Sequence, residues 1–298
     1  MDDTQETRAG FVAFIGAPNA GKSTLLNQIL GEKLSIVTRK AQTTRIRVLG
    51  LLTEKNAQIG LIDTPGLFKP KTKLERSMVQ AAWDSLEGAD LVLLLVDASA
   101  RQPDAKTESI VEALATRGQR ATLVLNKVDA IKPGKLLPLA ENLQASGLFD
   151  EIFMISALTG DGVSELRDHM YQAMPLGPWP YPEDQLTDLP EQLLAAEITR
   201  EQLLEQLHDE LPYGAVVMPE GWEVRKDGSI AIQQQILVER VNHRAMVLGK
   251  QGARIKAIGS AAREEMAAQL GCKVHLFLDI KVDERWQDKP DYYRMFGI

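Results

Sequence analysis

The sequence contains few of the residues that bind transition metals or cross-link a chain. One cysteine, Cys272, excludes an internal disulfide, and the four histidines are scattered without the close helical spacing of a zinc site. Cys272 lies in the stretch CKVHLFLDI, in which apolar residues alternate. We therefore expect a buried, reduced thiol at this position and no metal ion held by histidine or thiolate.

Long hydrophobic runs and an excess of basic residues are also missing. No uninterrupted apolar stretch approaches the roughly 18 residues that span a membrane. The first residues, MDDTQETRAG, are acidic, unlike an export signal. These absences predict a cytoplasmic globular protein. The formal net charge of -7 disfavours indiscriminate coating of nucleic acid, but it is compatible with a local basic patch.

A proline-rich stretch divides the chain into two parts. With 298 residues, of which 44% are hydrophobic, the chain can bury more than one core. Five prolines lie between residues 175 and 190, and they predict a stiff, extended linker because proline fixes φ and removes a backbone donor. The predicted organisation is a flexible tail over residues 1–8, a first domain over 9–175, a linker over 176–190, a second domain over 191–283 and a C-terminal tail over 284–298.

The first part alternates short β-rich runs with amphipathic helical stretches. Several β-rich runs are continuously apolar, which is typical of strands that helices cover on both faces. Two neighbouring runs have no helix between them and predict an antiparallel hairpin at one edge. The pattern therefore predicts a doubly wound, mostly parallel α/β sheet. Strands are predicted at Phe11–Ile15, Ile46–Thr53, Gln58–Ile62, Leu91–Val96, Ala121–Leu125 and Glu151–Ile155, and helices at Lys22–Leu30, Lys73–Glu87, Lys106–Arg117 and Val163–Met174.

The second part predicts a smaller α+β unit. A helix over Glu191–Leu207 precedes two strands, Ala215–Arg225 and Ile230–Arg240, which the hairpin turn Asp227-Gly228 joins. A glycine-flanked turn, a helix over Ala253–Leu270 and a strand over Lys273–Val282 complete the unit.

Residues 16–23, GAPNAGKS, fit the phosphate-loop pattern G-x-x-x-x-G-K-[ST] between a predicted strand and a predicted helix. The glycines let backbone N–H groups and the positive end of the helix face an anion. We expect Lys22 to reach the β- and γ-phosphates of a nucleotide and Ser23 to ligate Mg²⁺. An ordinary glycine turn before a helix is the alternative. The predicted nucleotide-binding residues of this loop are Asn19, Ala20, Gly21, Lys22, Ser23 and Thr24.

The motif DTPG, residues 63–66, follows another predicted strand. Asp63 can hold Mg²⁺ through water there, and the N–H of Gly66 can meet a γ-phosphate. A β-turn with proline at its centre explains the same four residues.

Two later motifs contain residues that can recognise the base of the nucleotide. In NKVD, Asp129 can accept hydrogen bonds from the guanine N1–H and N2–H₂ groups, which adenine does not offer, and we include Asn126 and Lys127 in the site. In SAL, Ser156 and Ala157 can place a backbone N–H near the guanine O6. Alternatively, Ser156 caps the next helix.

In this order, GAPNAGKS, QTTR, DTPG, NKVD and SAL resemble the guanine-nucleotide motifs of translation-factor-class GTPases. With the C-terminal features below, nearly the whole chain is similar to the Era-like family of bacterial GTPases. The resemblance implies a P-loop fold that binds GTP, GDP and Mg²⁺, with Lys22, Thr44 and Gly66 in catalytic roles. It places the first switch around Gln42 to Arg45, where Thr44, or the adjacent Thr43, senses Mg²⁺. The implied metal-binding residues are Ser23, Thr44 and Asp63.

Three positions qualify the resemblance. Leu67 stands where Ras-like GTPases carry the glutamine that orients the attacking water, so we expect slow intrinsic hydrolysis. Asn19 resembles the asparagine that helps to coordinate a potassium ion in related GTPases, although an asparagine that satisfies its own turn is the alternative. Leu158 replaces the lysine often found after the Ser-Ala pair.

Residues 249–252, Gly-Lys-Gln-Gly, form a G-x-x-G turn in a locally basic stretch. With a helix and two strands before it and a strand after it, the turn resembles the clamp of a type II KH domain. The alternative is a solvated, charged helix face. In the tail, Trp286 and Tyr292 can stack on bases or cap the core. The resemblance implies an RNA site made of Gly249, Lys250, Gln251, Gly252, Arg254, Ile255 and Lys256.

The family resemblance implies a monomeric, GTP-hydrolysing switch that binds the 3′ end of 16S ribosomal RNA and acts in maturation of the small (30S) ribosomal subunit. Peripheral association with the inner face of the cell membrane stays open. One alternative is an RNA-binding module whose nucleotide site serves stability alone. Another is an ATP-using enzyme, in which Asp129 would have no role in selecting the base.

Overall fold

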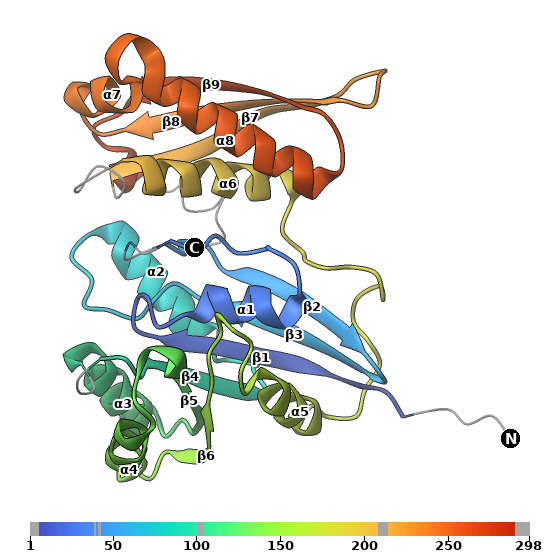
Figure 1. Cartoon of the computed structure of the whole chain (residues 1–298), viewed down its shortest axis with the longest axis vertical. Coiled ribbons are helices and arrows are strands. Elements are labelled where there is room, and N and C mark those ends of the chain that lie inside the picture. The colour runs from blue at the N-terminus through green and yellow to red at the C-terminus, as the bar shows by residue number, and fades with distance from the viewer. Residues whose placement is uncertain (1–5, 39, 41–42, 101–103, 208–213, 290–298) are drawn as a thin grey trace, which may run out of the picture. The chain divides into compact units, whose positions relative to one another are not determined.

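A computed structural model describes residues 6–38, 40, 43–100, 104–207 and 214–289 of the chain. These residues form two units, each with its own sheet and core (Figure 1). The first unit contains the residues up to Ser35 and those from Thr44 to Asp188. The second contains Ile36–Thr43 and the residues from Leu189 to the end of the described chain. A short loop from the first part of the sequence therefore belongs to the second unit.

Six strands form the sheet of the first unit, in the order β2-β3-β1-β4-β5-β6. β2 runs antiparallel to β3 and the other neighbouring pairs are parallel, which confirms the predicted mostly parallel sheet with a hairpin at its edge. The edge strand β6 starts at Phe149, two residues before the predicted Glu151. The first part of the strand was not predicted because its acidic residues are exposed and break the apolar pattern. The strands are β1 (Arg8–Gly16), β2 (Val48–Glu54), β3 (Ala57–Asp63), β4 (Leu91–Asp97), β5 (Ala121–Asn126) and β6 (Phe149–Met154).

Five helices among the described residues accompany this sheet: α1 (Lys22–Leu30), α2 (Lys73–Asp84), α3 (Ala105–Arg117), α4 (Leu136–Gln144) and α5 (Val163–Ala173). A capping box of Thr72 and Glu75 starts α2, which ends at Asp84 rather than at the predicted Glu87, because a turn over residues 85–88 replaces its last part. α4 is missing from the predicted helices because it contains Pro138. Proline is tolerated there since it occupies the first turn, where no backbone donor is needed.

The central strands β1, β3, β4 and β5 are largely buried on both faces, as their continuous apolar runs predict. Ala13 and Ile15 of β1 belong to a core cluster with residues of α2, α3 and α4. Val12 and Phe14 alternate with them, so their side chains point to the opposite face, and they are equally buried. This packing fixes the carboxyl ends of the central strands, where ligands bind in open α/β sheets.

The proline-rich stretch contains bends, a turn and isolated bridges, and most of it belongs to the first unit. Residues up to Asp188 belong to that unit. Leu51 donates its N–H to the carbonyl of Leu186 (2.8 Å), and Thr187 Oγ1 donates to the carbonyl of Leu49 (2.7 Å). The stretch thereby pairs with the edge strand β2, whose backbone groups would otherwise lack partners.

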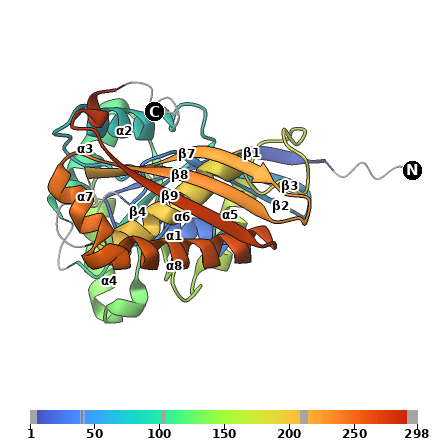
Figure 2. The same cartoon turned by 90° about the horizontal axis from the view of Figure 1, so that it is seen from above.

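The second unit has a three-stranded sheet in the order β7-β8-β9. β7 is antiparallel and β9 parallel to β8, and Figure 2 shows the strands crossing over α6 and α8. Ala196 and Leu203 of α6 and Ile258 of α8 share a core with the strand residues Val217 and Ile236. None of the described helices of either unit is both long and apolar enough to cross a bilayer. The elements are α6 (Glu191–Gln206), β7 (Ala215–Val224), β8 (Ile230–Val238), α7 (Val241–Leu248), α8 (Ala253–Leu270) and β9 (Val274–Val282).

Candidate active site and nucleic-acid interface

The loop between β1 and α1 curls around the start of the helix. Its backbone is left-handed at Asn19 (φ 66°) and at Gly21 (φ 98°). A Cβ atom at Gly21 would lie 2.1 Å from Nδ2 of Asn126, so only glycine fits this close approach. Because α1 begins at Lys22, the unpaired N–H groups and the positive end of the helix dipole lie at this loop.

Lys22 is the buried cation of the loop. Its Nζ donates to the carbonyl oxygens of Gly16 (3.3 Å) and Ala17 (3.2 Å). Burial lowers the pKa of Lys22 to about 8, and the Asp63 carboxylate offsets part of this effect. An anion brought to the loop would favour the charged ammonium and raise the pKa of Lys22 again.

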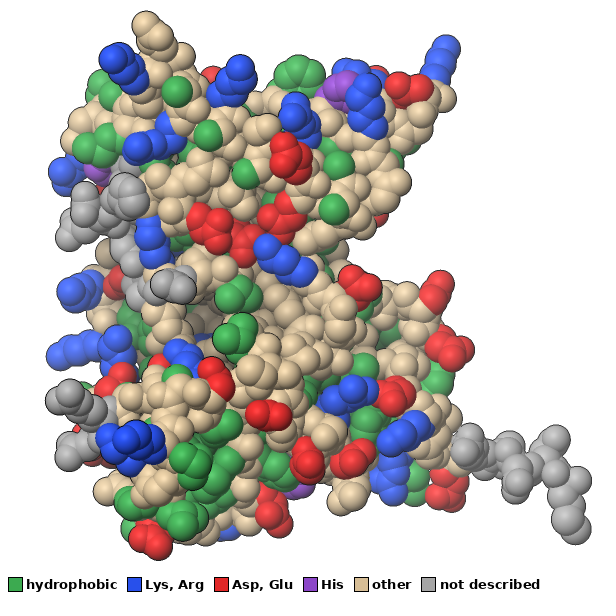
Figure 3. Space-filling model, viewed as in Figure 1, with side chains coloured by type: hydrophobic (Ala, Val, Ile, Leu, Met, Phe, Trp, Pro, Cys, Tyr) green, Lys and Arg blue, Asp and Glu red, His purple; other side chains and the backbone are tan. Residues whose placement is uncertain are grey.

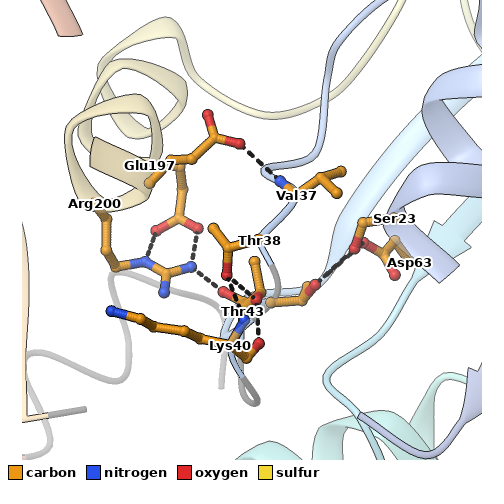
Figure 4. Close-up of polar contacts among 10 residues, drawn as sticks. Ser23, Val37, Thr38, Lys40, Thr43, Asp63, Glu197 and Arg200 are labelled. Atoms are coloured by element: carbon orange, nitrogen blue, oxygen red, sulfur yellow. Dashed lines mark hydrogen bonds and ion pairs between the residues drawn. The ribbon is translucent and has the colours of Figure 1, made fainter. Parts of the chain in front are cut away.

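Three side-chain oxygens from separate segments meet beside the loop (Figure 4). Ser23 Oγ donates to Asp63 Oδ2 (2.6 Å) and lies 2.8 Å from Thr44 Oγ1, which is itself 3.4 Å from the same carboxylate oxygen. Thr43 is not part of this cluster. Its hydroxyl lies 2.8 Å from Thr38 Oγ1 and donates to the carbonyl of Lys40 (2.7 Å).

The carboxylate of this cluster is set up for an additional partner. Asp63 is fully buried, and its Oδ1 accepts no hydrogen bond from the residues that the structure describes. Burial raises the pKa of Asp63, although the positive charge of Lys22 opposes the rise. A buried carboxylate oxygen without a donor is costly, and two hydroxyls with a carboxylate are the oxygen ligands that Mg²⁺ prefers. The donor set therefore fits a magnesium ion.

The DTPG motif lies against the phosphate loop and forms no β-turn. A Cβ atom at Gly66 would lie 2.8 Å from the backbone nitrogen of Pro18. The next N–H, of Leu67, donates to the carbonyl of Gly16 (3.0 Å). The Leu67 side chain is buried in the core of the unit, so it does not project into the site.

Asn126 links the phosphate loop to the SAL motif. Its Nδ2 donates to the carbonyl of Ala20 (2.8 Å), and its Oδ1 accepts the N–H of Ala157 (2.9 Å). The Ala157 N–H therefore orients Asn126 in this structure. Ser156 is fully buried, and its Oγ accepts the N–H of Thr159 (3.2 Å) within a turn; it does not cap the next helix, α5, whose N-cap is Gly162.

Asp129 and Leu158 present exposed side chains beside this network. Asp129 lies in a 3₁₀ turn, Val128–Ala130, that follows the left-handed Lys127, and its carboxylate is accessible. Leu158 is 75% exposed, a large value for leucine next to the buried Ala157. Both side chains are therefore available to a ligand.

Asp97 is a member of this site that sequence reasoning missed. It ends β4, and its Oδ2 accepts a hydrogen bond from Lys127 Nζ (2.6 Å), while Oδ1 accepts the N–H of Ser99 (2.9 Å). Burial raises the pKa of Asp97, but the bonds from Lys127 and Ser99 outweigh burial and hold the pKa below its usual value. A carboxylate directly after a buried strand was the available signal, as at Asp63.

In the second unit, the GKQG turn joins α7 to α8 in an unusual backbone conformation. Gly249, Gln251 and Gly252 all have positive φ angles. A Cβ atom at Gly249 would lie 2.6 Å from the Cβ of Arg254, so glycine is required for this close turn. The turn thereby exposes Lys250 at the start of α8, beside its positive helix end.

The side chains around this turn divide into a basic surface and a core. Figure 3 shows Lys and Arg side chains on the face that carries α7 and α8. Arg254 and Lys256 are exposed and Ile255 is half-buried, whereas Ile258 is fully buried and belongs to the core. Trp286 is also buried and donates from Nε1 to the carbonyl of Gly214 (3.2 Å), which confirms that it caps the core. Tyr292 lies outside the described residues.

Two family models match the chain: residues 11–127 match the 50S ribosome-binding GTPase family and residues 210–287 match the KH domain. GTPase Era of Erythrobacter litoralis (strain HTCC2594) is 51% identical over 296 residues, which cover 98% of this chain and 97% of the relative. The chain belongs to the Era GTPase family. It therefore hydrolyses GTP to GDP and phosphate and carries an RNA-binding type of domain at its C-terminal side.

Two solved Era structures support the fold over the whole chain. Each covers 98% of this chain and 99% of its own, with a TM-score of 0.92. One, 39% identical, is an Aquifex aeolicus Era variant bound to GDP and AlF₄⁻. The other, 40% identical, is Era in complex with MgGDPNP and nucleotides 1506–1542 of 16S ribosomal RNA. The predicted P-loop sheet followed by a KH domain is thereby confirmed.

Proposed function

We propose that this Era-family chain is a GTP-driven switch that binds the 3′ end of 16S ribosomal RNA through its KH domain during maturation of the 30S subunit. The observation that carries the switch is the meeting of Ser23, Thr44 and Asp63 beside Lys22. These residues come from α1, from the segment before β2 and from the end of β3. A γ-phosphate and its cation would hold all three segments together, and their loss would release them.

Ser23 and Thr44 would hold Mg²⁺ through their hydroxyls, and Asp63 would hold it through water. When bound, the cation neutralises charge on the β- and γ-phosphates. Lys22 approaches the same phosphates from the loop side, and the N–H groups of Gly21 and Gly66 line the loop without a side chain to block access. Thr44, rather than Thr43, is the threonine that the cluster favours.

Guanine selection is assigned to Asp129, with Asn126 as the residue that ties the base loops to the phosphate loop. The accessible Asp129 carboxylate can accept both guanine donors, whereas adenine leaves it without donors. Exposed Leu158 can cover one face of the base. Loss of the Asn126 bonds would free the phosphate loop and the SAL loop at once.

Slow intrinsic hydrolysis follows from the position of Leu67. Its side chain is apolar and lies in the core, so it cannot orient a water molecule. Backbone N–H groups near Gly66 are left for that task. By the family resemblance we also propose a potassium ion at Asn19 as an additional charge at the phosphates; its left-handed backbone fits a turn asparagine equally well. Equal rates of GTP turnover in potassium and in sodium buffers would refute the proposed potassium site.

The RNA site is assigned to the GKQG turn and the start of α8. The turn brings backbone close to a ligand, Lys250, Arg254 and Lys256 supply charge, and Ile255 supplies an apolar contact. The Era complex with nucleotides 1506–1542 of 16S ribosomal RNA supports this choice of RNA. We further propose that the protein acts in the cytoplasm as a monomer on the 30S subunit, with peripheral membrane contact as a secondary location.

Binding of a short RNA with the 3′ sequence of 16S ribosomal RNA tests this function in the presence of GDP, GTP or a non-hydrolysable GTP analogue. We expect tighter binding with GTP or its analogue, and faster GTP turnover when the RNA is added. Lys250→Glu should weaken RNA binding, whereas Lys226→Glu, at the exposed β7–β8 turn of the same unit, should not. Equal affinity in all nucleotide states would refute the switch and favour a module with a merely structural nucleotide site.

A further inference from the structure

Three described residues of the loop Ile36–Thr43, which belongs to the second unit, bond to α6 or to the residue that follows it, and Figure 4 shows the contact between Thr43 and Arg200. The N–H of Val37 donates to Glu201 Oε1 (2.8 Å). Lys40 Nζ donates to the carbonyl of Leu207, and Arg200 Nη2 donates to the carbonyl of Thr43. The start, the middle and the end of the loop are therefore each bonded within the second unit, although the loop precedes β2 of the first.

Arg200 is held rigidly at the end of this set of contacts. It is 2% exposed, and its Nε donates to Oε1 of the buried Glu197 (2.7 Å), one turn earlier on α6. Nη2 also bonds the second oxygen of Glu197, so the planar guanidinium is clamped by a two-point contact. A buried cation fixed in this way has little freedom, and the Thr43 carbonyl that it binds is fixed with it.

The bond to Thr43 also orients the residue that follows. The Thr43 carbonyl oxygen and the N and Cα atoms of Thr44 lie in one peptide plane, since the peptide bond does not rotate freely. An anchor on that oxygen therefore limits where the Thr44 side chain can point. Thr44 Oγ1 in turn lies 2.8 Å from Ser23 Oγ in the magnesium-fitting cluster. A single peptide plane thus joins Arg200 to the nucleotide site.

We propose that Arg200 is a positioning residue for Thr44, and that through it α6 of the KH unit contributes to the selection of GTP over GDP. The inference rests on the proposed function, in which Thr44 senses Mg²⁺ and the γ-phosphate. Arg200 touches neither nucleotide nor metal. It acts by holding the Thr43–Thr44 peptide in the orientation that brings the Thr44 hydroxyl to Ser23 and Asp63.

The test compares Arg200→Ala and Arg200→Lys with Thr199→Val, which alters the neighbouring buried residue of α6. Thr199 Oγ1 donates to Gln234 Oε1 on β8 (2.6 Å) and forms no hydrogen bond with the described residues of the loop, so Thr199→Val controls for general damage to the unit. Affinities for GDP and for a non-hydrolysable GTP analogue are measured by fluorescence titration of the full chain, in Mg²⁺ and in excess chelator. Thermal unfolding checks that each variant is folded.

In Mg²⁺ we expect both Arg200 variants to lose about tenfold in analogue affinity relative to GDP, the size of one charged hydrogen bond. The loss should vanish in chelator, and Thr199→Val should show none. Equal changes for both nucleotides, a loss that persists in chelator, or the same loss in Thr199→Val would overturn the proposal. If Arg200→Ala does not fold, Arg200→Lys alone tests the proposal, because its ammonium keeps a positive charge beside the buried Glu197 and preserves folding.

Thr44→Ala separates this inference from the proposed function. If Thr44→Ala loses analogue selectivity in Mg²⁺ while the Arg200 variants keep it, Arg200 has no positioning role and the magnesium cluster stands. If Thr44→Ala binds both nucleotides as the parent does, the assignment of Thr44 fails first. If Thr44→Ala and the Arg200 variants all lose selectivity for the analogue while Thr199→Val keeps it, the result supports a role for Arg200 in positioning Thr44.

Discussion

Raising the pH should weaken nucleotide binding because Lys22 loses its proton at a lower pH in the nucleotide-free protein than in the complex. In the nucleotide-free protein, burial lowers the pKa of Lys22 to about 8, with partial compensation from Asp63. Phosphate oxygens favour the charged ammonium and raise its pKa again. The pKa is therefore lower in the free protein than in the complex, so binding takes up a proton, and affinity falls as the pH rises through 8.

The size of the effect follows from this pKa. At pH 7 about nine-tenths of the free protein carries a protonated Lys22, and at pH 9 about one-tenth does. If the complex keeps Lys22 charged throughout, binding at pH 9 takes up about one proton. The dissociation constant for GTP should then rise about tenfold between pH 7 and pH 9, which corresponds to about 1.4 kcal/mol.

Titration calorimetry in buffers of different ionisation enthalpy measures both the affinity and the number of protons taken up. Lys22→Arg is the matched control, because a guanidinium stays charged over this range, whereas any ionisation of guanine affects both proteins alike. We expect a flatter pH dependence for Lys22→Arg, whatever its absolute affinity. A parent protein that takes up no proton at pH 9, or the same slope in both proteins, would refute the role assigned to the buried lysine.

Three other substitutions test separate parts of the molecule. Asp129→Asn should lower GTP affinity at least about tenfold and raise the relative affinity for xanthosine triphosphate, as competition binding would show, since it replaces an acceptor with a donor. Glu197→Ala leaves the buried Arg200 charge without its carboxylate and should lower the free energy of unfolding by about 3–5 kcal/mol in urea titrations, whereas a loss below about 1 kcal/mol would mean that water reaches the pair. Lys250→Glu should reduce the salt dependence of RNA binding by about one phosphate contact without changing GTP affinity, and an altered GTP affinity would place Lys250 elsewhere in the mechanism.

The nucleotide half of the site could be predicted because its residues follow local rules. Asp63 and Asn126 each end a buried strand, Ser156 follows the edge strand β6, and the carboxyl ends of parallel strands share one edge of the sheet. The helix after the phosphate loop has the predicted bounds, since Lys22 and the left-handed Gly31 mark its ends. Short-range spacing was sufficient for all of these features.

The contacts of α6 could not be predicted in the same way. Arg200 and Thr43 are 157 residues apart, and no motif connects them. Thr199, Arg200 and Glu201 are consecutive on α6 and all buried. Charged residues on a helix ordinarily form a solvent-exposed face, so the sequence predicts exposure where the structure shows burial. The contacts of the proline-rich stretch could not be predicted for a related reason. Its composition predicts a linker, but only its pairing with β2 shows that it is bound along the first unit.

Reciprocity limits how the two ligands of this protein can communicate. If bound MgGTP favours the arrangement in which Arg200 holds the Thr43 carbonyl, an RNA that favours the same arrangement must raise GTP affinity by the same factor. RNA that binds equally well whether or not the loop lies on α6 would shift nothing, however tightly it binds. Coupling therefore requires that the KH unit differ near α6 between its RNA-bound and RNA-free states. The residues of the GKQG turn alone do not supply that difference, because no hydrogen bond joins Gly249 or Lys250 to the described residues of the loop. The core shared by α6, α8 and the strands is the physical connection through which contact at the turn would reach Arg200.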